Sequence, residues 1–395
     1  MAKTDFKKNT LLPLLSACFI AFGFSMGGTQ LVLADIAREF NMQYTAMGSI
    51  VMIYFVATLS MPIVFGNLGD KYGKKKIIAI AFVFYIGGCL LATFSQNIAG
   101  LSVGMFVLGA GTSVIECTGA AALSDSNPEK AEKNINISES FYSGGAVISP
   151  LVVAAMMAAG ANWRIVFIVS AVVFLALIPL LKITKFIIQE PEGGHKLKRQ
   201  SFLSLFKSKI LIIMFICMIV YVGVETGAAY FADSFFTAEL GQPSFSAIAI
   251  SFYWLAMTVS RVIFGIVKVN PQKFLKVSFG LSAAMLVPLA LSNNAPLALA
   301  IFIIIGFLYG AIWPTLMALA TKRFTASSGT VASIMMVGSG IGGAAFPVLI
   351  GLVADTVNLR WSMGLMVIFC FVAFLCCAVA FKNTKPAFAS ENDAG

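Results

Sequence analysis

Long apolar stretches alternate with short polar connections along the whole chain. Most stretches approach the ~20 residues that a helix needs to cross about 30 Å of hydrocarbon. In lipid, backbone polar groups stay paired only within helices or closed barrels, and we interpret these stretches as helices. The pattern predicts an all-α membrane protein with twelve transmembrane helices, over residues 10–33, 46–66, 77–95, 100–123, 138–160, 163–181, 210–232, 246–267, 277–291, 297–320, 330–353 and 361–381.

The longest connection falls in the middle of the chain. Residues 182–209 carry seven basic residues and a Pro-Glu-Gly-Gly turn, with six predicted helices on either side. We therefore predict an N-terminal six-helix bundle over 1–181, a cytoplasmic linker over 182–209, and a C-terminal six-helix bundle over 210–395 that ends in a short cytoplasmic tail. The linker holds the only histidine, His195, which we expect to be neither a metal ligand nor a catalytic base.

The two predicted bundles are related in sequence. Three pairs of residues in the fourth and fifth helices of each half are 197 residues apart: Gly109 and Gly306, Gly145 and Gly342, and Pro150 and Pro347. Glycine and proline are common in membrane helices, so chance is the alternative explanation. An internal duplication that gives two pseudo-symmetric bundles is expected of a transporter whose halves rock about a central site.

The basic residues fix a predicted orientation. Of the 27 Lys and Arg residues, all but Arg38, Arg164, Arg261 and Arg360 lie at the chain ends or in every second connection. The positive-inside rule makes that side cytoplasmic, with both termini there, in a cell membrane of the inner or plasma type. The net charge of +10 then reflects topology. We expect no nucleic-acid partner, because such a partner requires a basic face on a soluble domain.

Composition leads to the same class of protein. Hydrophobic residues make up 59% of the chain and charged residues 11%, against about 45–50% and 25% in soluble proteins. All seven cysteines lie within predicted helices, so we expect neither a disulfide framework nor a metal site. The lipid bilayer and a small-molecule substrate are the predicted partners of a monomer.

Charged residues inside predicted helices are the first functional candidates. Glu116, Glu225 and Arg261 each cost at least about 2.5–3.5 kcal/mol at a helix centre, so each needs a cavity, a partner or a proton. Glu225 stands between two nearby glycines, and a carboxyl group in such surroundings can carry a proton reversibly. A structural hydrogen bond is the alternative for Glu225. For Arg261 the alternatives are snorkelling and a pairing with Glu116 or Glu139 that closes the cytoplasmic side.

Polar and aromatic residues near mid-membrane are candidates for substrate binding. Flat aromatic faces and amide or hydroxyl groups suit a small polar solute, although packing and lipid contact are the commoner roles of membrane aromatics. An indole N–H in the membrane also needs a partner, and the Trp-Pro pair at 313–314 predicts a kink. The candidates are Thr29, Gln30, Tyr221, Tyr253, Trp254, Tyr309 and Trp313.

The connection after the second predicted helix holds the most specific short motif. Residues 66–76 read Gly-Asn-Leu-Gly-Asp-Lys-Tyr-Gly-Lys-Lys-Lys. An ordinary positive-inside loop would not require Asp70 or Gly73. The motif resembles the signature of the major facilitator superfamily, which implies the major facilitator fold and a role in conformational gating for Gly66, Asp70, Lys71, Gly73 and Lys74.

The second half resembles one branch of that superfamily, the fucose/galactose/glucose:cation symporters. The similar segments are Tyr-Val-Gly-Val-Glu at 221–225, Tyr-Trp at 253–254 followed by Arg and Gly at 261 and 265, Trp-Pro-Thr-Leu at 313–316, and the Gly-Gly-Ala…Pro…Gly…Asp pattern over 342–355. The resemblance implies uptake of a monosaccharide driven by H⁺ or Na⁺, with no other cofactor. Carboxylates such as Glu225 and Glu116 would be the coupling groups. The first-helix carboxylate of fucose symporters is absent, and Gln30 lies in that region.

Other functions fit the sequence less well. A proton-coupled efflux antiporter of drugs or metabolites is the main alternative, but such antiporters carry Gly-Pro-x-x-Gly-Gly late in the fifth helix, where this chain has Ser-Pro-Leu-Val-Val-Ala at 149–154. An enzyme needs a catalytic constellation, which the sequence does not offer. A nutrient sensor usually adds a cytoplasmic output domain. We therefore predict a secondary active transporter without enzymatic activity.

Overall fold

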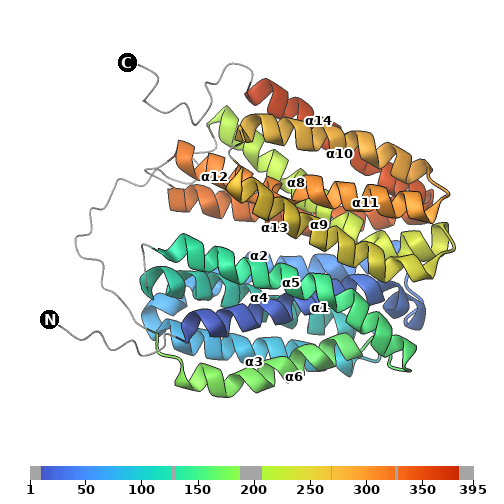
Figure 1. Ribbon diagram of the computed structural model, residues 1–395. Coiled ribbons are helices and arrows are strands. Elements are labelled where there is room, and N and C mark those ends of the chain that lie inside the picture. The colour runs from blue at the N-terminus through green and yellow to red at the C-terminus, as the bar shows by residue number, and fades with distance from the viewer. Residues whose placement is uncertain (1–9, 127–129, 187–206, 268, 325–327, 382–395) are drawn as a thin grey trace, which may run out of the picture. The chain divides into compact units, whose positions relative to one another are not determined.

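The computed structural model describes residues 10–126, 130–186, 207–267, 269–324 and 328–381 of the chain (Figure 1). Within these ranges the regular structure is helical, with no strand. Most of the predicted linker, with His195, and both chain ends lie outside the described residues.

Six long helices form the first half of the described chain: α1 (Leu11–Glu39), α2 (Tyr44–Tyr72), α3 (Lys74–Thr93), α4 (Ile98–Ser126), α5 (Ala131–Ala158) and α6 (Ile165–Ile183). The second half contains α8 (Lys209–Ser234), η2 (Phe235–Glu239), η3 (Pro243–Phe245), α9 (Ser246–Ile266), α10 (Pro271–Leu291), α11 (Ala295–Gly310), α12 (Ile312–Arg323), α13 (Ser328–Thr356) and α14 (Leu359–Ala380). Among the described residues, twelve helical segments are long and apolar enough to cross a membrane, with α11 and α12 forming one of them. The predicted all-α, twelve-helix fold is confirmed.

Several helices extend beyond the stretches that hydropathy marks. The first runs over Leu11–Glu39 where the apolar pattern predicts 10–33, and the second over Tyr44–Tyr72 instead of 46–66. Hydropathy detects the part of a helix that lies in hydrocarbon, whereas backbone hydrogen bonding continues through the headgroup region. Acidic residues at helix ends, such as Asp35, therefore lie within helices although they lie outside the predicted stretches.

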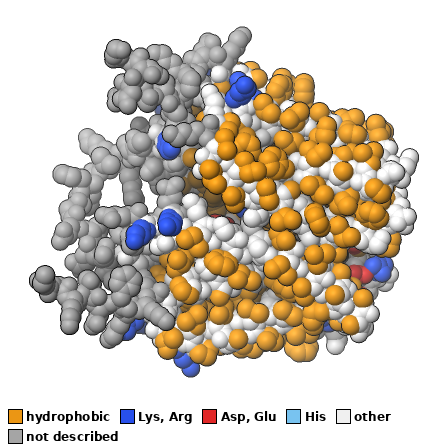
Figure 2. Space-filling model, in the orientation of Figure 1, with side chains coloured by type: hydrophobic (Ala, Val, Ile, Leu, Met, Phe, Trp, Pro, Cys, Tyr) orange, Lys and Arg blue, Asp and Glu red, His pale blue; other side chains and the backbone are white. Residues whose placement is uncertain are grey.

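The exterior of the described helices is apolar. Val83 on α3 is 67% exposed and Ile266 at the end of α9 is 78% exposed. Figure 2 shows hydrophobic side chains spread widely over the described part of the face in view. Apolar surface on this scale needs an apolar surrounding, which the lipid bilayer provides. The chain is a multi-pass membrane protein.

The contacts between residues divide the chain into two compact units. Unit 1 comprises Met1–Thr29 and Ile53–Gly193, and unit 2 comprises Gln30–Met52 and Gly194–Gly395. The last third of α1, the connection that follows it and the first part of α2 therefore group with α8 to α14. We call residues 30–52 the crossover segment.

The glycines that suggested an internal duplication have matching surroundings. A side chain at Gly109 would meet the carbonyl oxygen of Tyr54 at 2.6 Å, and one at Gly306 would meet that of Tyr253 at 2.6 Å. In both cases two helix backbones touch where only glycine fits. The second predicted pair behaves alike, with Gly145 against Ile20 and Gly342 against Ile219. The duplication therefore has a structural counterpart in each unit.

A pair of arginines repeats in the same way. Arg164 precedes α6 and donates from its guanidinium to carbonyl oxygens at the end of α3 and just beyond it, and Arg360 near the start of α14 does the same at the end of α10. These carbonyls have no donor within their own helix, so the guanidinium satisfies them. The acceptors correspond at a spacing of 197 residues and are Thr93 and Ser95 for Arg164, and Ala290 and Ser292 for Arg360.

Candidate functional site

Glu225 lies at the centre of a polar cluster in unit 2. It projects from α8 and is half-buried, and Arg261 of α9 lies close enough to act on its charge. The Tyr221 hydroxyl, one turn earlier on α8, lies near both groups without a hydrogen bond of normal geometry. The Tyr253 hydroxyl is also buried, within electrostatic range of Glu225. The fold thus brings together an acid, a base and two phenols that are separate in sequence.

A helix break fixes the position of Arg261. The predicted kink is confirmed, because α11 ends at Gly310 and α12 begins at Ile312. Pro314 has no N–H to donate to the carbonyl oxygen four residues earlier, which is that of Gly310. Arg261 Nε donates to this oxygen over 2.9 Å. The arginine therefore satisfies an acceptor that the proline has left open.

Gln30 and Trp254 form a second polar contact in unit 2. The Trp254 indole Nε1–H donates to Gln30 Oε1 over 2.9 Å. Because the indole is only a donor, the amide must turn its oxygen toward it. Gln30 is fully buried, and its Nε2 has no hydrogen-bond partner among the described residues. The two N–H donors of the Gln30 amide are therefore available to bind an acceptor.

The remaining aromatic candidates differ in their surroundings. Tyr309 of α11 is buried, and its ring lies edge-on to Tyr221 with 5.9 Å between centroids. Its hydroxyl lies 3.4 Å from the Cys370 sulfur, in hydrogen-bond contact. Trp313, in the first turn of α12, is half-buried. Thr29 is buried, and its hydroxyl already donates to the Ser25 carbonyl oxygen over 2.7 Å.

Glu116 lies in unit 1, on α4. It is half-buried, and the charged group that acts on it is Glu139 of α5. Burial makes a charge on Glu116 costly, and two carboxylates near each other also repel when both are ionised. Such a pair is suited to hold a proton or a cation.

The comparisons with known proteins now give the family. The sequence model of the Major Facilitator Superfamily matches residues 14–344, and matches again over 214–394. The chain belongs to the Major Facilitator Superfamily. The family is one of transporters and not of enzymes, as predicted.

Curated relatives in this superfamily cover the chain almost from end to end. The putative glucose/galactose transporter of Helicobacter pylori (strain ATCC 700392 / 26695) is 25% identical, over 92% of this chain and 94% of its own. The glucose/mannose transporter GlcP of Bacillus subtilis (strain 168) is 24% identical, over 95% of this chain and 96% of its own. These relatives confirm the resemblance to the fucose/galactose/glucose branch.

Solved structures confirm the major facilitator fold. A bacterial homolog of the human lysosomal transporter Spinster, in an inward-facing and unoccupied conformation, matches with a TM-score of 0.79 and 14% identity, over 96% of this chain and 98% of that one. The fucose:proton symporter FucP of E. coli matches with a TM-score of 0.65 and 18% identity, over 93% of this chain and 98% of that one.

The superfamily signature at 66–76 spans the end of α2, a tight turn at Gly73 and the start of α3, all within unit 1. Gly73 has a φ of 93°, a value that side chains other than glycine rarely adopt, and it separates α2 from α3. Lys74 forms an ion pair with Asp125 at the end of α4. Lys71 lies over the Tyr72 ring, 5.0 Å from its centroid. The Asp70 side chain and Gly66 lie outside what the structure describes at side-chain level.

Some polar residues near these groups were missed by sequence reasoning. Lys75 donates to the carbonyl oxygens of Lys182 and Thr184 over 2.8 and 2.7 Å, which closes the end of α6. Asp233 is 6% exposed near the end of α8, because that helix continues past the predicted limit at residue 232. The sequence contains no Gly or Pro between residues 228 and 240, which indicates a helix that continues past residue 232. This signal could have placed Asp233 within the helix.

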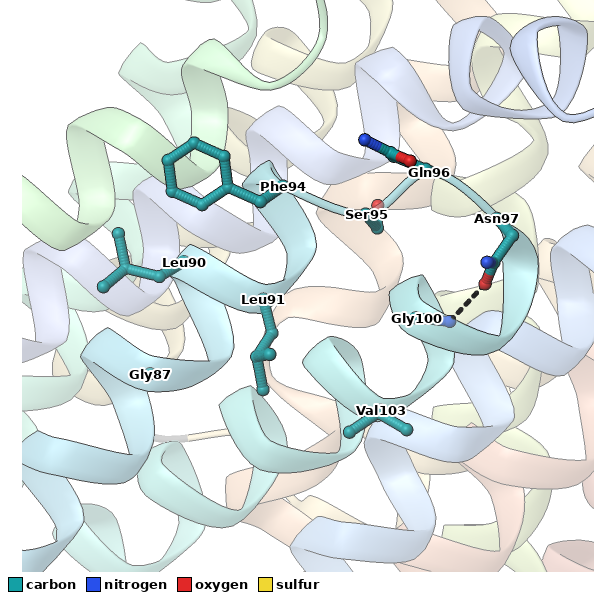
Figure 3. A pocket seen from close by; sticks show the side chains of 9 residues that line it. All are labelled: Gly87, Leu90, Leu91, Phe94, Ser95, Gln96, Asn97, Gly100 and Val103. Atoms are coloured by element: carbon teal, nitrogen blue, oxygen red, sulfur yellow. Dashed lines mark hydrogen bonds between the residues drawn. The ribbon is translucent and has the colours of Figure 1, made fainter.

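The cleft in Figure 3 is separate from the polar cluster around Glu225. It has a volume of about 710 Å³ and lies in unit 1, between the end of α3, the connecting turn and the start of α4. Its lining includes Leu90, Leu91 and Phe94, and Asn97 Oδ1 accepts from the Gly100 N–H at 2.8 Å. No charged side chain lines it, so it offers no coupling group.

Proposed function

We propose that this chain is a secondary active transporter that takes up a monosaccharide together with H⁺ or Na⁺ by alternating access. The family and the relatives named as glucose transporters support the substrate class. The observation that carries the proposal is the pair of Gln30 and Trp254, which offers two unused amide N–H donors beside an aromatic face. Sugars present hydroxyl oxygens and an apolar ring face, and this pair of groups complements both.

The coupling step is assigned to Glu225. In its ionised form the carboxylate is stabilised by Arg261 and by the nearby Tyr221 hydroxyl. A proton or Na⁺ that binds the carboxylate competes with Arg261 for it. Arg261 keeps its bond to the Gly310 carbonyl oxygen in the meantime. Release of the cation restores the attraction between Glu225 and Arg261, so cation binding and the arrangement of α8 and α9 are linked.

Glu116 is the second coupling candidate, and Glu139 shares its role. Their mutual repulsion is relieved when one of them binds a proton or when Na⁺ lies between them. We further propose a monomer in a cell membrane of the inner or plasma type, with both termini cytoplasmic and H⁺ or Na⁺ as its only cofactor. The basic connections support this orientation.

Reconstitution tests this function directly. Purified protein in liposomes is given a panel of labelled hexoses under an imposed pH gradient, an imposed sodium gradient, or neither. We expect one hexose to accumulate above equilibrium under one gradient, and an ionophore that dissipates the gradient to abolish the accumulation. If no hexose accumulates under either gradient, the proposal is wrong. Expulsion of preloaded compounds in exchange for external protons would instead identify an efflux antiporter.

A further inference from the structure

Asp355 links the end of α13 to the start of α2. It is the second-to-last residue of α13, and its carboxylate accepts three hydrogen bonds from the start of α2. The donors are the Tyr44 N–H at 2.8 Å, the Thr45 N–H at 2.7 Å and the Thr45 hydroxyl at 2.6 Å. These two backbone N–H groups belong to the first turn of α2, where a helix supplies no acceptor of its own.

The carboxylate therefore caps α2 from a helix more than 300 positions away in sequence. A helix N-terminus carries a partial positive charge, so an anionic cap is favoured there by electrostatics as well as by hydrogen bonds. An N-cap normally precedes its own helix in sequence. Here α13 supplies it, and the stability of the first turn of α2 depends on the closeness of the two helices.

Close packing places the cap. A side chain at Gly351 would collide with the carbonyl oxygen of Tyr44, and one at Gly48 would collide with that of Pro347. The backbones of α2 and α13 thus touch at two points along one crossing. The Tyr44 ring also packs against Phe231 of α8, with 6.2 Å between centroids.

The crossover segment is consequently held at two places. Gln30 binds Trp254 in the proposed sugar site, and Tyr44 with Thr45 binds Asp355. A sugar that takes over the Gln30 amide acts on the first anchor only. The second anchor is independent of substrate, and it is exposed, so water can replace its bonds when the helices part. A contact of this kind is strong enough to favour one state and weak enough to be reversible.

We propose that Asp355 is a latch: its bonds to Tyr44 and Thr45 hold the crossover segment against α13 on the side of the membrane opposite the proposed cytoplasmic termini. The latch thereby sets the fraction of molecules that are closed to the outside. This inference rests on the proposed alternating access. It does not depend on which solute is carried.

The test measures access to the space behind the latch. Met47, one turn along α2 from Tyr44, is 2% exposed and is replaced by Cys as a reporter in the full-length chain. Whole cells are treated with a membrane-impermeant maleimide, with the chain lacking the reporter as blank. Loss of a helix cap corresponds to about a fivefold change in an equilibrium constant. We expect Asp355→Asn to speed labelling by about that factor, and Thr45→Val, which removes one of three bonds, by roughly twofold.

A neighbouring cap provides the matched control. Asn358 Oδ1 accepts from the Trp361 N–H at 3.0 Å and caps α14, a helix that is not part of the crossover segment. Asn358→Ala should leave the labelling rate within about twofold of the parent, because it removes a cap of similar strength elsewhere. Parental labelling rates in both Asp355→Asn and Thr45→Val, or an equal increase in Asn358→Ala, would overturn the latch. Because labelling needs no substrate, a failure of the hexose assays leaves this result interpretable on its own.

Discussion

Arg261 donates a hydrogen bond from Nε to the carbonyl oxygen of Gly310 over 2.9 Å. That oxygen is available because Pro314, four residues later, has no N–H. The proline thus does more than interrupt the helix between α11 and α12. It creates an acceptor that holds a guanidinium within range of Glu225. The predicted kink at Pro314 and the predicted intramembrane charge of Arg261 are thus linked by one hydrogen bond.

Replacing Pro314 with Ala should weaken the hydrogen bond between Arg261 and the Gly310 carbonyl oxygen. The new N–H competes with Arg261 for the Gly310 carbonyl oxygen, so the guanidinium loses a fixed partner. We expect α11 and α12 to join and concentrative uptake to fall about 3- to 10-fold, the range for one net hydrogen bond. Uptake assays in liposomes measure the effect. Pro288→Ala in α10 is the control, because that proline lies inside another helix of the same unit. Equal losses in the two variants would argue against a specific role for Pro314.

Replacing Glu225 with Gln should separate accumulation from exchange. Glutamine retains the shape of the side chain but cannot carry a proton or attract Na⁺, so concentrative uptake should fall to background. Exchange of labelled for unlabelled sugar across the membrane should persist, because it requires no net movement of the cation. Glu239→Gln serves as control, since Glu239 pairs with Arg360 near the start of α14. Undiminished accumulation in the Glu225 variant would remove this carboxyl from the coupling step.

The fold could be predicted from the sequence because it depends on hydropathy and charge. Apolar stretches of sufficient length predicted the twelve helices, and three pairs of residues predicted the duplication that Gly109 and Gly306 now display in matching contacts. The ends of the helices were harder to predict, since neither hydropathy nor charge marks them. Asp233 was missed for this reason, although it lies in the same helix as Glu225.

The candidate site was predictable as a set of residues and not as a set of contacts. Gln30 and Trp254 were each chosen for their chemistry, but their hydrogen bond joins positions 224 residues apart. Arg261 was expected to snorkel or to meet an acid, and its bond to a backbone oxygen depends on where α9 crosses α11. Such crossings are set by helix packing, which a single sequence does not encode in any local pattern.

Replacing Trp254 with Phe should weaken sugar binding. Phenylalanine keeps an aromatic face but removes the indole N–H, so the Gln30 amide loses its anchor and is free to rotate. We expect the KM for the transported hexose to rise about 5- to 10-fold, as for one lost hydrogen bond, with little change in maximal rate. Trp361→Phe is the matched control, because Trp361 is 66% exposed at the start of α14. An unchanged KM in the Trp254 variant would count against the proposed sugar site.

Replacing Arg360 with Ala should destabilise unit 2. The side chain donates to Glu239 Oε2 at 3.0 Å and to the Ser292 carbonyl oxygen at 2.6 Å, and its loss leaves both without that donor. Hydrogen bonds to charged groups contribute about 1.5–3 kcal/mol each, so the melting temperature in detergent should fall by several degrees. The duplication supplies the comparison, because Arg164 makes the corresponding carbonyl contacts in unit 1. Arg164→Ala should likewise lower the melting temperature, because the Thr93 and Ser95 carbonyl oxygens lose the same kind of donor. An unchanged melting temperature in the Arg360 variant would show that its bonds to Glu239 and Ser292 do not stabilise unit 2.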